Sequence, residues 1–141
     1  MPPSKSRILV VDDEALVRSM VLEVLTMLGY ETDAAVSAIE ALAMFDHKTY
    51  DLALIDFLMP EMNGDELARR LRQKAPGVKI LMSTGFDDDP ALARAQAEGV
   101  LVIQKPVGIE RLHAAIDHLL SEGMPSQEFP EPSQPGARWA S

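Results

Sequence analysis

Short apolar runs alternate with longer amphipathic stretches over most of the chain, and this pattern restricts the possible folds more than any other feature. We expect strands at residues 7–11, 31–35, 51–55, 78–83 and 100–103. Most of these runs are almost continuously apolar, as in parallel strands that helices cover on both faces. The second run is more polar and suits an edge of the sheet.

Signals for helices fill the intervals between these strands. A stretch at about 14–28 ends at Gly29, which favours a left-handed helix C-terminus, and Ser37 with Glu40 predicts a capping box. Further helices are expected at about 65–74, from Asp89 to Gly99 and at about 109–120. The strict alternation predicts an α/β fold with a doubly wound, five-stranded parallel sheet and helices on both faces.

The composition of the 141-residue chain limits its function classes. The net charge of -9 argues against nonspecific binding to nucleic acid or to an anionic membrane. Cysteine is absent, which excludes disulfides and thiolate chemistry. The N-terminus has no apolar stretch long enough for a signal peptide or a membrane span, so we expect a cytoplasmic protein. We expect an extension at 1–6, one globular domain at 7–121 and a disordered, proline-rich tail at 122–141.

Acidic, hydroxyl and basic side chains follow four of the expected strands. Asp12 and Asp13 end the first run, Asp56 the third, Thr84 the fourth and Lys105 the fifth. Each of them alone has an ordinary interpretation, as a helix cap, a loop acid, a strand-end threonine or a solvated lysine. However, the carboxyl ends of parallel strands meet at one edge of the sheet, where such folds bind ligands. Together these residues predict one shared site.

The three acids predict a cation site beside a phosphate site. Carboxylates in one cleft repel each other unless a cation joins them, and hard oxygen ligands suit Mg²⁺. A carboxylate held beside Mg²⁺ can attack phosphorus, and Asp56, which precedes an apolar stretch at 57–59, is the candidate nucleophile. The Thr84 hydroxyl and the Lys105 ammonium are candidates to contact phosphoryl oxygens.

Four motifs resemble those of the receiver domains of two-component response regulators, which take a phosphoryl group from a phosphohistidine. They are Val-Val-Asp-Asp-Glu at 10–14, Asp56 with Met-Pro-Glu-Met-Asn-Gly at 59–64, Ser-Thr-Gly at 83–85 and Lys-Pro at 105–106. The motifs occur in the family's order and at its spacing, and the resemblance covers about residues 6–121. It implies a flavodoxin-like receiver fold of the kind found in chemotaxis regulators.

The resemblance also implies roles for individual residues and partners. Asp56 would be phosphorylated, and Mg²⁺ would be bound by Asp13, Asp56 and the backbone carbonyl of Leu58, with Asp12 assisting through water. The donor would be a histidine kinase or a histidine phosphotransfer protein. Output would pass through a protein partner or self-association, without nucleic acid or membrane. Catalysis would be limited to the domain's own phosphorylation and dephosphorylation.

One position departs from the family pattern. The resemblance implies that Thr84 and Lys105 contact the phosphoryl group and couple it to a conformational change. In the family, a Tyr or Phe three residues before the lysine rotates on activation, but Val102 occupies this position here. The sequence therefore leaves open how the change is transmitted.

Two apolar residues bear on the lifetime of the phosphate. In this family, the positions two beyond the aspartate and two beyond the threonine influence water access, and here they are Leu58 and Phe86. Neither side chain can orient an attacking water by hydrogen bonding, so we expect slow self-dephosphorylation. A lifetime of seconds that is unchanged in Leu58→Asn would contradict this expectation.

The first helix has a wider apolar surface than packing against a core requires. Beside a core stripe, Leu16, Met20 and Met27 extend the apolar arc. We expect a deeply packed helix, and the alternative is a docking patch for a kinase or phosphotransfer helix that uses adaptable methionines.

Two other functions stay open from the sequence. A Mg²⁺-dependent aspartate-nucleophile phosphatase or phosphotransferase uses the same chemistry, although its nucleophile normally ends the first strand in an Asp-x-Asp pattern, whereas this chain has Asp12 next to Asp13. A receiver-like scaffold that is never phosphorylated is the other alternative, and Val102 keeps it open.

Overall fold

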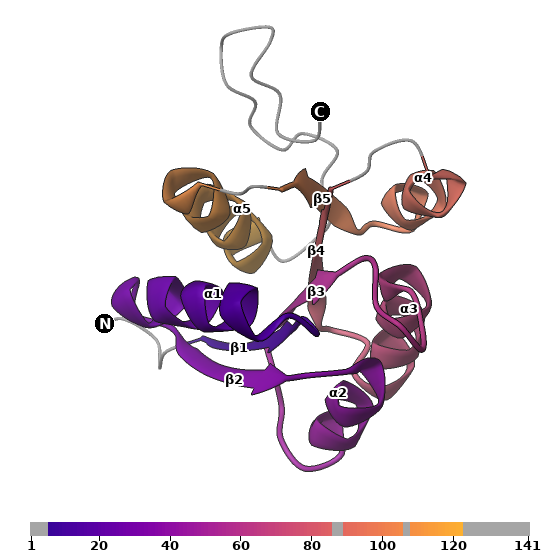
Figure 1. Ribbon diagram of the computed structural model, residues 1–141, viewed down its shortest axis with the longest axis horizontal. Coiled ribbons are helices and arrows are strands. Elements are labelled where there is room, and N and C mark those ends of the chain that lie inside the picture. Colours follow the sequence, from indigo (N-terminus) through magenta and orange to yellow (C-terminus); the bar gives the residue numbers. More distant parts are fainter. Residues whose placement is uncertain (1–5, 86–88, 106–107, 123–141) are drawn as a thin grey trace, which may run out of the picture.

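The computed structural model describes residues 6–85, 89–105 and 108–122, which form one parallel sheet with helices around it (Figure 1). The strands are β1 (Arg7–Val11), β2 (Glu31–Ala35), β3 (Leu52–Asp56), β4 (Lys79–Thr84) and β5 (Leu101–Gln104). The helices are α1 (Ala15–Met27), α2 (Ala38–Phe45), α3 (Gly64–Lys74), α4 (Pro90–Ala97) and α5 (Ile109–Glu122). The strand order β2-β1-β3-β4-β5 confirms the doubly wound fold and the edge position of the polar second strand.

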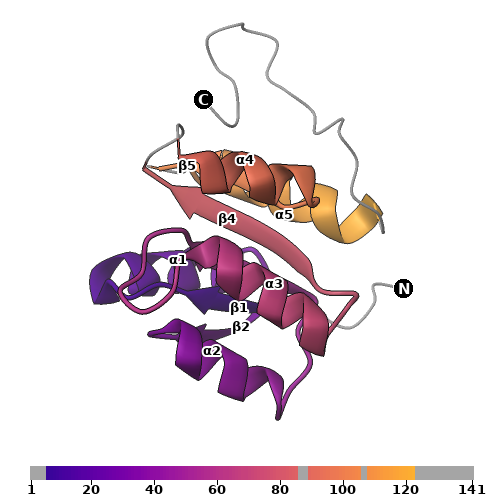
Figure 2. The same cartoon turned by 90° about the vertical axis from the view of Figure 1, so that its right-hand side faces the viewer.

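The helices divide between the two faces of the sheet (Figures 1 and 2). Helices α2, α3 and α4 pack on one face, and α1 and α5 pack on the other. Successive strand residues alternate between the two cores: Leu9 and Val11 face the first, and Ile8 and Val10 face the second. Strands β1, β3 and β4 are therefore buried on both sides, which explains why their sequences are almost continuously apolar.

Strand β3 ends one residue later than the apolar run suggests. Asp56 is paired with Ser83 of β4, and the backbone N–H of Phe57 donates a 2.9 Å hydrogen bond to the carbonyl of Ser83. The ladder continues because backbone pairing does not require an apolar side chain. Asp56 is thus held by the sheet itself rather than by a loop.

The predicted helix ends are present. Gly29 follows α1 with a φ of 100°, the left-handed conformation that glycine adopts without strain. Before α2, the Ser37 hydroxyl accepts a 3.1 Å bond from Glu40 N–H, and the Glu40 carboxylate accepts a 2.7 Å bond from Val36 N–H. In the usual capping box the Glu side chain bonds to the N–H of the N-cap residue itself. Here it bonds to the N–H of Val36, the residue before the N-cap Ser37.

Helix α1 is less deeply packed than we expected. Leu25 is its single fully buried residue, and the Met20 side chain is 58% exposed. Leu16 and Met27 are exposed as well. The interpretation of α1 as a deeply packed helix is wrong for these three residues, because the core beneath α1 is filled by strand residues and by α5.

Some sequence expectations lie outside the described residues. These include the disorder expected for the tail beyond residue 122, the role of Phe86 and the conformation of Pro106. Among the helices of the described part, none combines the length and the apolarity that crossing a membrane demands.

A tyrosine hydroxyl ties the edge strand β2 to the segment before β3. Tyr50 Oη donates a 2.7 Å hydrogen bond to Asp33 Oδ2, which also accepts a 3.0 Å bond from Lys48 Nζ. Burial raises the pKa of the Asp33 carboxyl, but the hydrogen bonds from Tyr50 and Lys48 outweigh burial and lower that pKa overall. The ionised form of Asp33 is therefore stabilised in the folded protein.

We expect Tyr50→Phe to lower the free energy of unfolding by about 1 kcal/mol at neutral pH, because it removes this charge-assisted bond. A carboxyl whose folded pKa is lowered stabilises the protein above its unfolded pKa, and this contribution is lost as pH falls through the folded pKa. The difference in free energy of unfolding between parent and variant should therefore become smaller in acid, as measured by urea unfolding at several pH values. Tyr30→Phe, at the other tyrosine, is the control and should show no such narrowing.

Candidate functional site

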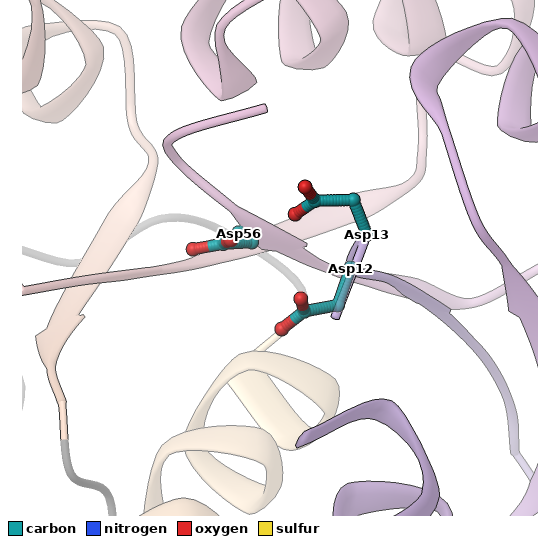
Figure 3. A group of neighbouring side chains, drawn as sticks. All are labelled: Asp12, Asp13 and Asp56. Atoms are coloured by element: carbon teal, nitrogen blue, oxygen red, sulfur yellow. The ribbon is translucent and has the colours of Figure 1, made fainter. Parts of the chain in front are cut away.

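Three carboxylates meet at the carboxyl edge of the sheet (Figure 3). Asp12 and Asp13 directly follow β1, and Asp56 is the last residue of β3. The pairing of Val11 with Ile55 places the ends of these strands side by side. One oxygen from each of the three carboxylates lies within 4.8 Å of the others. The sequence prediction that these acids converge is confirmed.

The inner acid of the pair is fixed by the start of α1. Asp12 is 5% exposed, and its Oδ1 accepts a 2.9 Å hydrogen bond from Glu14 N–H. The Arg18 guanidinium donates a 2.8 Å bond to the Asp12 backbone carbonyl. Asp13, in contrast, is exposed. Arg18 was not among the predicted site residues, and its position one turn into the helix that follows the acids is the signal that could have revealed it.

Lys105 brings a positive charge to these acids from β5. Its Nζ lies 2.9 Å from Asp56 Oδ1 and 3.8 Å from Asp12 Oδ2. Its backbone N–H donates a 2.8 Å bond to the Thr84 carbonyl, which continues the pairing of β4 with β5 and positions the side chain. One lysine thus contacts two carboxylates in a cluster of three.

Burial and the neighbouring charges together shift the pKa values of Asp56 and Lys105. Burial raises the pKa of Asp56, Lys105 opposes this rise, and the neighbouring charges of Asp12 and Asp13 add to it, so that the net shift is upward. Burial lowers the pKa of Lys105, but Asp56, Asp12 and Glu14 together outweigh burial and raise it. Lys105 is therefore held in its charged form, and the cluster favours a further positive charge.

The residues at the end of β4 flank the acceptor strand. Thr84 ends β4 and is 1% exposed, and Ser83, paired with Asp56, is also buried. Ser83 lines the same cavity as Asp56 and Lys105, a placement that the sequence analysis did not assign. The signal available was the parallel register, which puts Ser83 opposite Asp56 on the same face of the sheet. Val102 belongs to the core on the α2, α3 and α4 face.

The segment after Asp56 closes tightly onto the strand. Gly64 N–H donates a 2.7 Å hydrogen bond to the Phe57 carbonyl. A Cβ atom at Gly64 would lie 3.0 Å from the Asp56 carbonyl oxygen and 3.0 Å from Phe57 Cα, so only glycine fits without displacement. Leu58, two residues after Asp56, is 46% exposed, whereas Phe86 lies outside the described residues. The effect of these two residues on phosphate lifetime stays a prediction.

The donor set fits a hard divalent cation. Three carboxylates with one oxygen each within 4.8 Å supply oxygen ligands only, and one of the acids is open to solvent, which leaves room for bound water. The net negative charge around Asp56 would be relieved by such a cation. The acidic cluster could therefore hold Mg²⁺.

Comparison with known proteins agrees with this geometry. A family model described as the response regulator receiver domain matches residues 8–117. The response regulator MprA of Mycobacterium sp. (strain KMS) is 32% identical over 86% of this chain and 53% of its own length. The crystal structure of a CheY-like receiver domain protein from Methanospirillum hungatei JF-1 is 33% identical, with a TM-score of 0.81, and the match covers 85% of this chain and 97% of that one.

The first curated relatives are longer than this chain. The chain spans about half the length of the first curated relatives it matches. It spans 27% of the transcriptional regulatory protein GlrR of Escherichia coli (strain K12), which is 31% identical over 86% of this chain. Because one relative is named as a transcriptional regulator, the expectation of a function without nucleic acid gains no support. The fold, the cluster of acids with Lys105 and the match over residues 8–117 lead to one assignment: the chain belongs to the response regulator receiver domain family of two-component signalling.

Proposed function

We propose that Asp56 accepts a phosphoryl group from a phosphohistidine in a Mg²⁺-dependent reaction. The observation that carries this proposal is the position of Asp56, which is fixed by the sheet, contacts Lys105 at 2.9 Å and lies within a cluster of three carboxylates. A carboxylate so placed is a nucleophile held in one orientation. A purely structural acid would not need two further acids beside it.

The transfer forms one bond and breaks another. An oxygen of Asp56 attacks phosphorus, the phosphorus–nitrogen bond to the donor imidazole breaks, and the imidazole leaves with the bonding electrons and takes up a proton. Lys105, which lies 2.9 Å from Asp56, is proposed to contact an oxygen of the incoming phosphoryl group, and Thr84 at the adjacent strand end is proposed to bond to another. Both contacts stabilise negative charge as it shifts toward the protein.

Mg²⁺ would be held by Asp13, Asp56 and the backbone carbonyl of Leu58, with Asp12 acting through water. When bound, it would neutralise charge on the transferred group and on the carboxylates. The chain's own residues orient this site, since Glu14 N–H and Arg18 fix Asp12 and the sheet fixes Asp56.

The direct experiment is incubation of the chain with acetyl phosphate and Mg²⁺, followed by intact mass spectrometry. We expect a mass gain of one phosphoryl group. A receiver-like scaffold would show no gain, and a phosphatase would turn over a generic phosphate ester, so that sustained release of phosphate from such an ester would also contradict the proposal.

The exposed apolar residues of α1 suggest where the donor binds. Leu16, Met20 and Met27 project from the helix that begins beside Asp12 and Asp13, and Met20 lines the cavity that also contains Asp56. We propose that the phosphohistidine-bearing protein, a histidine kinase or histidine phosphotransfer protein, packs a helix on this surface. Methionines suit such a contact because they adapt to the partner.

We expect Met20→Glu to slow transfer from a phosphohistidine protein several-fold while leaving phosphorylation by acetyl phosphate unchanged. The glutamate charge would be buried when the phosphohistidine protein binds, which weakens association. Acetyl phosphate does not contact this surface. Ile39→Glu is the control, because Ile39 is a similarly exposed apolar residue on α2, which packs on the other face of the sheet. Equal slowing with both donors would count against the docking surface.

A further inference from the structure

A buried serine lies beside the proposed phosphoryl acceptor. Ser83 is 8% exposed and lines the same cavity as Asp56 and Lys105. In the parallel pairing of β3 with β4, Ser83 is the partner of Asp56. Neighbouring strands are about 4.8 Å apart, and both side chains project from the same face of the sheet. A change of side-chain rotamer can therefore bring the Ser83 hydroxyl to the Asp56 carboxyl group.

The side chain of Lys105 passes this serine on its way to the acceptor. Strand β4 lies between β3 and β5 (Figure 1), so Lys105 crosses β4 to reach Asp56. Ile103 of β5 is paired with Ser83, and Lys105, two residues further on, lines the same cavity. Ser83 is therefore the β4 residue beside the contact between Lys105 and Asp56.

The hydroxyl of this serine is unpaired. No residue that the structure describes forms a hydrogen bond with it, whereas the backbone carbonyl of Ser83 accepts a bond from Phe57 N–H. Buried polar groups are almost always hydrogen-bonded, because a buried donor without a partner has lost its bonds to water without replacement. An unpaired hydroxyl that is buried at a reacting carboxylate is typical of a group that finds its partner during the reaction.

We propose that the Ser83 hydroxyl donates a hydrogen bond to the Asp56 carboxyl group during phosphoryl transfer, in the place that Lys105 leaves. This role rests on the proposed function, in which Lys105 contacts an oxygen of the phosphoryl group. When the ammonium moves to that oxygen, the Asp56 carboxyl group loses the donor that lies 2.9 Å from it. Ser83 then supplies another donor from the paired strand, and it becomes a further catalytic residue.

A hydrogen bond of this kind accelerates both formation and loss of the phosphoryl group. In either transition state, the bond between the Asp56 oxygen and phosphorus is partial, and the carboxyl group carries part of its negative charge. A donor that is unpaired before phosphorylation stabilises this transition state more than the starting state. In hydrolysis, the carboxyl group regains charge as its bond to phosphorus breaks, so the hydrogen bond becomes stronger.

The test compares Ser83→Thr with Ser83→Val. The two variants have nearly the same shape, and only the first retains a hydroxyl, so the pair separates hydrogen bonding from packing. The cavity of about 550 Å³ has room for the added methyl groups. In saturating acetyl phosphate and Mg²⁺, we expect the valine variant to be phosphorylated about tenfold more slowly than the threonine variant. Release of phosphate from the purified phosphorylated chains should differ in the same direction.

A second measurement separates this role from a general disturbance of the site. Ser83 does not bind the metal in this proposal, so the stabilisation by Mg²⁺, measured by urea unfolding, should be the same in both variants. Ser83→Ala removes the hydroxyl without adding a methyl group, and it should be slowed as the valine variant is. The alanine variant keeps the test available if valine prevents folding.

Three results would overturn the proposal. Equal rates in the threonine and valine variants would show that the hydroxyl serves packing or a bound water only. An alanine variant as fast as the parent would lead to the same conclusion. Loss of the Mg²⁺ stabilisation in the valine variant would show that the slower rate arises at the metal site. A parent chain that takes up no phosphoryl group would instead contradict the proposed function itself, so the two failures are distinguishable.

Discussion

Asp56→Asn is expected to abolish phosphoryl uptake from acetyl phosphate. The amide is not a nucleophile toward phosphorus, and Asp56 is the acid of the cluster that lies nearest to Lys105, at 2.9 Å against 3.8 Å for Asp12. Intact mass spectrometry should show a gain of one phosphoryl group in the parent and none in the variant. Asp117→Asn, at an exposed acid on α5, should take up the group as the parent does.

The same variant should be more stable than the parent when both are free of divalent cations. The folded pKa of Asp56 is raised, by burial above all, and by Asp12 and Asp13. A carboxyl with a raised pKa stabilises the folded state below its unfolded pKa, and that contribution is lost as pH rises through the folded pKa. At neutral pH the ionised Asp56 therefore lowers the free energy of unfolding. Urea unfolding should show a higher free energy of unfolding for Asp56→Asn than for the parent. A variant that took up phosphate, or that was less stable, would contradict this account of the site.

Mg²⁺ is expected to stabilise the parent chain strongly. A ligand that binds only the folded state adds about 2.7 kcal/mol to the free energy of unfolding at one hundred times its dissociation constant. The three carboxylates meet only in the folded chain, because Asp13 and Asp56 come from different strands. Urea unfolding with and without Mg²⁺ should reveal this increase, and a chelator should reverse it.

The stabilisation by Mg²⁺ should depend on the three clustered carboxylates. In Asp13→Asn the stabilisation by Mg²⁺ should largely vanish, and phosphorylation by acetyl phosphate should fall with it. Glu23→Gln, at an exposed acid on α1 outside the cluster, should keep both. An equal loss in the two variants would show that Mg²⁺ acts through general charge screening rather than at this site.

The arrangement of the site was predictable because topology fixes it. Once the alternation of strands and helices indicates a parallel sheet, the carboxyl ends of its strands must meet, and Asp12, Asp13, Asp56 and Lys105 all lie at or directly after such ends. The polar second strand was correctly placed at an edge. These conclusions rest on periodicity and on chain direction, which a single sequence carries.

Other features depend on contacts that the sequence does not encode locally. Strand β3 extends past Ile55 to Asp56 because the backbone N–H of Phe57 bonds to the carbonyl of Ser83 in the neighbouring strand. The exposure of Met20 depends on how α5 sits beside α1, which no pattern within α1 reveals. Arg18 and Ser83 were missed because their roles follow from the register and from the start of the helix, not from residue type.

The central claim is that Asp56 carries the phosphoryl group, and borohydride reduction tests it most directly. Borohydride converts an aspartyl phosphate into homoserine, which remains in the chain after the phosphate is lost. The parent chain should be phosphorylated with acetyl phosphate in Mg²⁺, reduced, digested and sequenced by tandem mass spectrometry. We predict homoserine at position 56. An unreduced Asp56, or homoserine at position 12 or 13 in its place, would contradict the account.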